Sequence, residues 1–144
     1  MPSNHRQVCA KVNAFVDEGA VETVEALAAF QGIRTHESCQ GVPGRRPIQV
    51  WFTCGYDGYE YPLMFAEWFG PALMEAVGDS AHFSVYWDTL GGRPRCLLEV
   101  RQEGAGRVVD ALRNLATKWV PPTESRLRRN SRSACDTHHR EPGS

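Results

Sequence analysis

The stretch HFSVYWDTLGGRPRCLLEVR, residues 82–101, decides the fold of this chain. Apolar residues occupy every second position before and after a glycine-containing turn: Phe83, Val85, Trp87, Cys96, Leu98 and Val100. A period of two is typical of strands that bury one face, and turns rich in Gly and Pro join such strands. The stretch therefore predicts a β-hairpin with the loop TLGGRP between its two strands.

A second hairpin is predicted earlier in the chain. Residues 33–39 read as one strand, GVPGRR at residues 41–46 as the turn, and a second strand runs through Val50 and Phe52. Because side chains alternate along a strand, Trp51 is expected on the face opposite to these two apolar residues.

Apolar residues at helical spacing mark the other ordered segments: 7–17, 21–28, 61–77 and about 105–119. Gly19 separates the first two, so we expect either one broken helix or two short ones. Pro71 should kink or restart the third helix, because proline removes a helical hydrogen bond.

The predicted order is helix, hairpin, helix, hairpin, helix. It indicates an α+β fold: a four-stranded antiparallel sheet from two ββα units, with an N-terminal helical segment and helices on one face. The opposite face is expected to be open, which makes it the first place to look for binding. Residues 1–120 are assigned to a single domain. Residues 121–144 are almost free of apolar side chains and are predicted to be a disordered basic tail.

The composition excludes several classes of protein. Hydrophobic residues make up 42% of the 144 residues and charged residues 23%, which is ordinary for a soluble globular domain. No stretch approaches the ~20 apolar residues of a membrane span, and the first residues lack a signal-peptide core. We therefore expect a cytoplasmic protein without a membrane partner.

The net charge of -1 gives no overall attraction to nucleic acid, although the sequence still allows a local basic patch that binds it. The 14 Arg against 2 Lys are typical of a GC-rich bacterial or phage genome.

Five cysteines are spread widely along the chain: Cys9, Cys39, Cys54, Cys96 and Cys135. Their odd number and the absence of a CxxC pair argue against a disulfide framework or a zinc ribbon. We expect free thiols in a reducing cytosol, several of them packed as small hydrophobic side chains. Cys135, His138 and His139 are too few ligands for a closed zinc site, so no metal is predicted.

The peptide THESCQG, residues 35–41, concentrates chemically useful side chains at the end of a predicted strand. Cys39, with His36 and Glu37, is a candidate for catalysis, because a thiol beside a base can act as a nucleophile. On a regular strand, however, His36 and Cys39 face opposite sides. A turn that contacts a ligand and a purely structural turn are the alternatives. The ligand-contacting alternative involves five residues: Thr35, Ser38, Cys39, Gln40 and Gly41.

Arginines occur in both hairpin loops. Arg45 and Arg46 in the first loop, with Arg93 and Arg95 at the second, would form a basic rim for a phosphate group, since a guanidinium binds phosphate through two hydrogen bonds. The apparent repeat predicts related positions for the two loops. The alternative is that loops carry charge because they are solvated.

Five aromatic residues are candidates for stacking against a ring: Trp51, Tyr56, Tyr59, Tyr86 and Trp87. Trp51 and Tyr86 alternate with core positions and are expected on the open sheet face, packing of Trp51 beneath a helix being the alternative. For Trp87 we favour the core, together with Trp68 and Trp119.

The pattern T-x-E-S-C-x-G at a strand end, followed by a strand that contains Trp51 and Phe52, resembles small bacterial and phage proteins of unknown function. More remotely it is similar to the wybutosine-synthesising methyltransferase family, which has T-S-S-C-S-G at a comparable place. That resemblance implies action on tRNA with S-adenosylmethionine as methyl donor. The residues that match the family motif are Thr35, Ser38, Cys39, Gly41 and Trp51.

Taken together, these patterns favour a binding protein for a small phosphate-bearing or nucleotide-like ligand, held between the Ser-Cys turn and the arginine-rich loops. Two other hypotheses stay open. One is an RNA-modifying enzyme, as the resemblance implies, and the other is a protein-interaction module that uses the open face or the tail. The residues themselves identify neither a cofactor nor an oligomeric state, so both are left unassigned.

Overall fold

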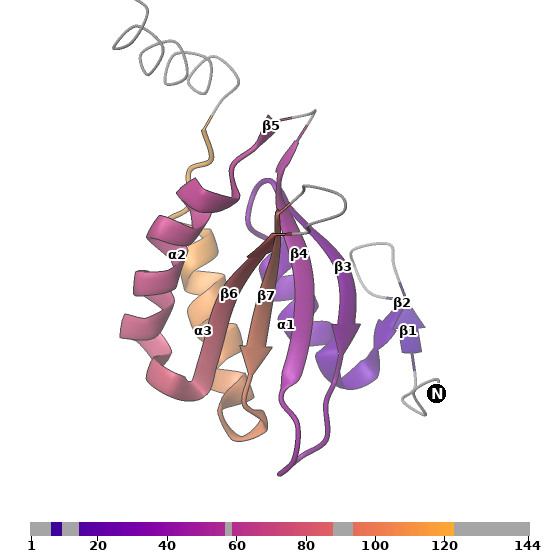
Figure 1. The fold of residues 1–144 in the computed structure, drawn as a ribbon. Helices are drawn as coiled ribbons and strands as arrows, with labels where there is room; N and C mark the ends of the chain where they lie inside the picture. The colour runs from indigo at the N-terminus through magenta and orange to yellow at the C-terminus, as the bar shows by residue number, and fades with distance from the viewer. Residues whose placement is uncertain (1–6, 10–14, 57–58, 88–93, 123–144) are drawn as a thin grey trace, which may run out of the picture.

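The computed structural model describes residues 7–9, 15–56, 59–87 and 94–122 (Figure 1). Within these residues the fold is α+β, as predicted, and the helices lie on one face of an antiparallel sheet with the strand order β3-β4-β7-β6. The strands of this sheet are β3 (Ile33–Cys39), β4 (Ile48–Tyr56), β6 (Ala81–Trp87) and β7 (Pro94–Val100). Short β5 (Tyr59–Glu60) pairs with the end of β4. The helices are α1 (Val21–Ala28), α2 (Pro62–Val77) and α3 (Ala105–Ala116), with 3₁₀ turns η1 (Glu18–Ala20), η2 (Gly78–Ser80) and η3 (Gln102–Gly104).

Both predicted hairpins are confirmed. The second strand of each hairpin pairs with the second strand of the other, and this pairing makes one sheet. β3 pairs with β4, β6 pairs with β7, and β4 pairs antiparallel with β7. Each hairpin is followed by a helix, so the two ββα units are also confirmed. The period-two alternation buries Val50, Phe52 and Leu98 completely against the helical layer.

The N-terminal helix predicted over residues 7–17 is wrong. β1 (Gln7–Cys9) and β2 (Phe15–Asp17) instead pair antiparallel as a separate two-stranded sheet. A tertiary contact explains the extended backbone: the buried carboxylate of Asp17 accepts a hydrogen bond from the backbone N–H of Gln40 at 3.1 Å. A short helix is marginal by itself, so such contacts override local periodicity. The second predicted helix is present as α1.

Pro71 does not interrupt α2, which continues as one helix from Pro62 to Val77. The predicted restart is therefore wrong. Pro71 deprives the carbonyl of Glu67, four residues earlier, of its helical donor. Both residues are exposed, so water can satisfy that carbonyl and the helix continues.

The core lies between the helices and the sheet and is rich in aromatic rings. Phe65 and Phe69 of α2 are stacked 4.7 Å apart and are fully buried. Trp68 and Trp119 pack against this core half-buried, as predicted. Trp87 does not: it is 58% exposed, because it is the last residue of an edge strand.

Candidate ligand-binding site

One face of the four-stranded sheet has no helix over it, and we call this side the open face (Figure 1). The strand register arranges its side chains in rows. Glu37, Trp51, Leu97 and Ser84 form one row across β3, β4, β7 and β6. Thr53 pairs with Arg34 in the neighbouring row, and Arg95 pairs with Tyr86 on the other two strands.

Trp51 and Tyr86 lie on the open face, as predicted, and their rings form an aromatic pair there. Their ring centroids lie 5.3 Å apart, and the guanidinium carbon of Arg95 lies 4.9 Å from the centre of the Trp51 ring. Leu97, which pairs with Trp51, is only 4% exposed, whereas Tyr86 is 48% exposed. The open face therefore presents the accessible ring of Tyr86 close to the guanidinium of Arg95, and the buried side chain of Leu97 lies beside them.

A β-bulge in β3 redirects the side chains of the THESCQG peptide. The register shifts between Thr35, which pairs with Phe52 on the core side, and Glu37, which pairs with Trp51 on the open face. His36 is the extra residue, and its Nε2 lies 2.8 Å from Oγ1 of Thr53. A bulge places two residues opposite one on the partner strand.

The bulge overturns one prediction about this peptide. Cys39 pairs with Gln49 and so lies on the same open face as His36, not on the opposite side. The two residues nevertheless make different contacts. His36 bonds to Thr53, whereas the Sγ of Cys39 accepts a hydrogen bond from the backbone N–H of Gly41 at 3.4 Å.

Positive charge dominates around His36. Burial lowers the pKa of its imidazole below the ordinary value of 6.5, and the guanidinium groups of Arg34 and Arg95 lower it further. The carboxylate of Glu37 raises this pKa by less than the two arginines lower it. The two arginines thus outweigh Glu37 in their effect on the His36 pKa, although Glu37 lies 4.0 Å from Arg95.

We expect the imidazole proton shifts of His36 to titrate by NMR with a pKa below 6.5. The unfolded chain then holds the proton more tightly, so stability falls as the pH drops below about 6.5. Arg34→Gln should raise this pKa, because it removes a positive charge beside the ring. Arg113→Gln on α3 is the matched control and should leave it unchanged. A wild-type pKa above 6.5 would contradict the arrangement.

The other residues of the Ser-Cys turn make structural contacts. Ser38 and Thr35 pair with buried residues of β4, on the core side of β3. The side-chain oxygen of Gln40 accepts a hydrogen bond from the backbone N–H of Gly19 at 2.7 Å. The backbone carbonyl of Gln40 accepts another from the side-chain amide of Gln102 at 2.6 Å. These contacts tie β3 to η1 and η3.

The predicted convergence of Arg95 with Arg45 and Arg46 is wrong. Val100 of β7 pairs with Ile48, the first residue after the loop of Arg45 and Arg46, whereas Pro94 pairs with Trp87 at the other end of β7. A strand rises about 3.3 Å per residue, so these ends lie about 20 Å apart. Arg95 belongs to the open face, and Arg45 and Arg46 belong to the opposite end of the sheet.

Arg34 and Thr53 lie on the open face but were not among the predicted site residues. Both alternate with residues that pair on the core side, Ile33 and Cys54, and strand periodicity already predicts Thr53 on the face opposite the core, with Trp51. The other missed feature is the bulge, which the alternation does not reveal.

Cys54 and Cys96 are buried in the core, where they pack as small hydrophobic side chains do. Their sulfur atoms lie 4.0 Å apart. The hydrogen bond to Cys96 and burial raise the pKa of the Cys54 thiol.

Several predictions concern residues outside the described ranges: Arg93, the tail beyond residue 122, and Cys135, His138 and His139. The same holds for the side chains of Cys9, Tyr56 and Tyr59.

Comparisons of the chain with protein-family models, with curated proteins and with solved structures found no match. The resemblance to the wybutosine-synthesising methyltransferase family therefore stays a prediction. In the part of the chain that the structure describes, no helix combines the length and apolar character that crossing a membrane requires.

Proposed function

We propose that the open face binds a small phosphate-bearing ligand with an aromatic ring, such as a nucleotide. In this proposal the ring stacks on Tyr86 beside Trp51, and Arg95 and Arg34 bind the phosphate. The observation that carries the proposal is the guanidinium of Arg95, which lies 4.9 Å over Trp51 next to an exposed tyrosine.

Both the aromatic ring and the phosphate of such a ligand would gain binding free energy on the open face. Stacking of one base on an aromatic side chain contributes about 1–3 kcal/mol. A guanidinium binds phosphate through paired, charge-assisted hydrogen bonds. Arg95 forms a long, exposed ion pair with Glu37 at 4.0 Å, and such pairs contribute little. A phosphate can therefore replace Glu37 as the partner of Arg95 at small loss.

The test compares nucleotides with their separate parts. Thermal shift and calorimetry with nucleoside phosphates, cyclic nucleotides, a nucleoside and pyrophosphate should show the strongest stabilisation with a nucleotide. Tyr86→Ala should weaken nucleotide binding about fivefold or more, because it removes the stacking surface. Arg95→Gln should weaken nucleotide binding but leave nucleoside binding little changed.

The matched controls lie on the same strand and on the helical side. Trp87→Ala removes an exposed ring one residue from Tyr86 whose side chain points to the other face of β6. Arg113→Gln removes an exposed guanidinium on α3. Equal losses in the controls and in Tyr86→Ala or Arg95→Gln would refute the proposal, as would the absence of binding by every nucleotide.

A further inference from the structure

A cavity of about 300 Å³ lies at the end of the sheet remote from the Arg34–Thr53 pair. Arg45 and Arg46 from the β3–β4 loop line it, and Arg101 and Glu103 from the segment after β7 lie across from them. Three guanidinium groups thus border the cavity against one carboxylate. An imbalance of this kind favours an anion.

The loop that carries Arg45 and Arg46 is held by its own hydrogen bonds. The N–H groups of Arg45 and Arg46 donate to the Val42 carbonyl at 2.9 and 2.8 Å, and the Val42 N–H donates to the Arg46 carbonyl at 3.0 Å. The side-chain amide of Gln102 also donates to the Arg46 carbonyl, at 3.1 Å. The two arginines therefore extend from a preorganised backbone, which reduces the entropy lost on binding.

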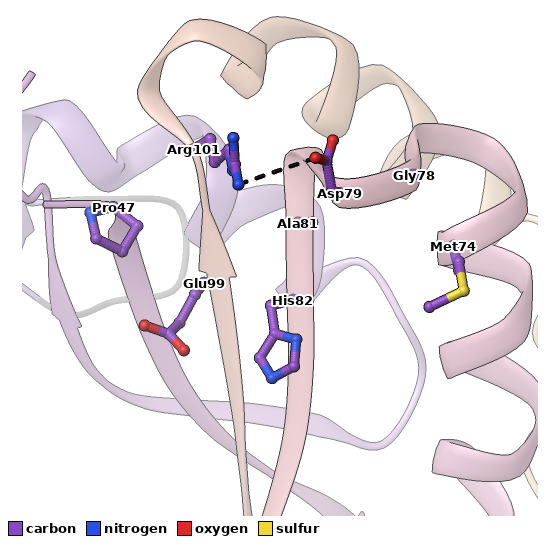
Figure 2. Close-up of a pocket in the computed structure, with 8 residues that line it drawn as sticks. All are labelled: Pro47, Met74, Gly78, Asp79, Ala81, His82, Glu99 and Arg101. Atoms are coloured by element: carbon purple, nitrogen blue, oxygen red, sulfur yellow. Dashed lines mark ion pairs between the residues drawn. The ribbon is translucent and has the colours of Figure 1, made fainter. Parts of the chain in front are cut away.

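Arg45 and Arg46 form no ion pair with any residue that the structure describes. Arg101 has a distant one, with its terminal nitrogen 3.9 Å from an Asp79 carboxylate oxygen (Figure 2). The backbone N–H of Arg101 donates to the Ser80 carbonyl at 2.9 Å and so fixes the start of its side chain. An incoming anion thus meets two guanidinium groups without an ion-pair partner among the described residues, and a third, that of Arg101, which also pairs with Asp79.

A second cavity, of about 610 Å³, shares Pro47 and Arg101 with the first. Its wall includes Met74 of α2, which is 72% exposed, and His82 and Glu99 from neighbouring strands (Figure 2). Pro47 and Met74 supply apolar surface to this wall from opposite sides, and the wall also carries the carboxylates of Asp79 and Glu99 (Figure 2). The volume lies within the range of small-molecule sites.

We propose that the two cavities form one binding site for a phosphomonoester. Arg45, Arg46 and Arg101 bind the phosphate, and Pro47 and Met74 contact the organic part. This site is separate from the open-face site: Thr53 comes five positions after Ile48 on β4, about 17 Å along the strand. It does not depend on the function proposed above.

The probes are inorganic phosphate and phenyl phosphate, with affinities measured by calorimetry on the full chain. We expect both to bind, and phenyl phosphate to bind more tightly. Arg46→Gln or Arg101→Gln should weaken both about tenfold, since each removes a charge-assisted hydrogen-bond donor. Met74→Ser should weaken phenyl phosphate alone.

A matched control separates this site from general attraction to positive charge. Arg113→Gln on α3 should leave both affinities within about twofold. No binding of either probe, or equal losses in Arg46→Gln and Arg113→Gln, would overturn the proposal. An unchanged phenyl phosphate affinity in Met74→Ser would overturn the assignment of the second cavity.

Discussion

Replacing Phe65 with alanine is expected to lower the free energy of unfolding by about 3–5 kcal/mol. The phenyl ring is fully buried, so its removal loses apolar burial and leaves a cavity that the surrounding rings can fill only in part. A loss of this size is a large fraction of the ~5–15 kcal/mol that stabilises an ordinary domain.

The expected effect is large because Phe65 contacts every layer of the fold. Its ring centroid lies between 4.7 and 6.1 Å from six other aromatic rings: Phe30, Phe52, Trp68, Phe69, Phe83 and Trp119. These residues come from the segment after α1, from β4 and β6, from α2 itself and from the segment after α3. One side chain thus connects both ββα units.

Urea unfolding followed by circular dichroism measures this loss. Leu63→Ala on the same helix is the matched control, because Leu63 is 52% exposed and should change stability by well under 1 kcal/mol. Similar losses in the two variants would contradict the packing around Phe65.

Local periodicity was enough to predict most of the fold. The alternation in residues 82–101 predicts the β6–β7 hairpin, and the residues that it assigns to the core are at least half-buried, apart from Trp87. Trp87 follows the pattern but lies at the end of an edge strand, where nothing in the alternation shows that burial stops. A sequence pattern gives the face of a strand and not the extent of the layer that covers it.

The candidate sites were harder to predict because they depend on pairing between distant segments. The loop of Arg45 and Arg46 and the paired strand ends at Trp87 and Pro94 lie at opposite ends of the sheet because β4 pairs antiparallel with β7. Had β4 paired antiparallel with β6, both loops would lie at one end. The alternation in each hairpin is the same in both arrangements.

The bulge at His36 shows the same limit on a smaller scale. One extra residue in β3 reverses the faces of Ser38 and Cys39, so the regular alternation places both on the wrong side. Nothing in THESCQG marks His36 as the extra residue. The contact with Thr53, seventeen positions away, becomes evident only when the two strands are paired.

Gly41→Ala is expected to destabilise the fold by about 2–5 kcal/mol and to weaken phosphate binding at the arginine-lined cavity. Gly41 has a φ of +67°, which costs an L-residue about 1–2 kcal/mol. A β-carbon there would also overlap the backbone carbonyls of Arg46 and Pro47, and overpacking adds about 1–3 kcal/mol. Relief requires movement of the backbone that positions Arg46.

Gly44→Ala is the matched control within the same loop. Its φ of +75° imposes the same conformational strain, but a β-carbon at Gly44 meets nothing within 4 Å. It should therefore lose only the conformational part, about 1–2 kcal/mol. Urea unfolding and calorimetry on both variants separate strain from overlap. If the two alanines destabilised the chain equally, the close approach of Gly41 to Arg46 and Pro47 would be refuted, because strain alone would explain both losses.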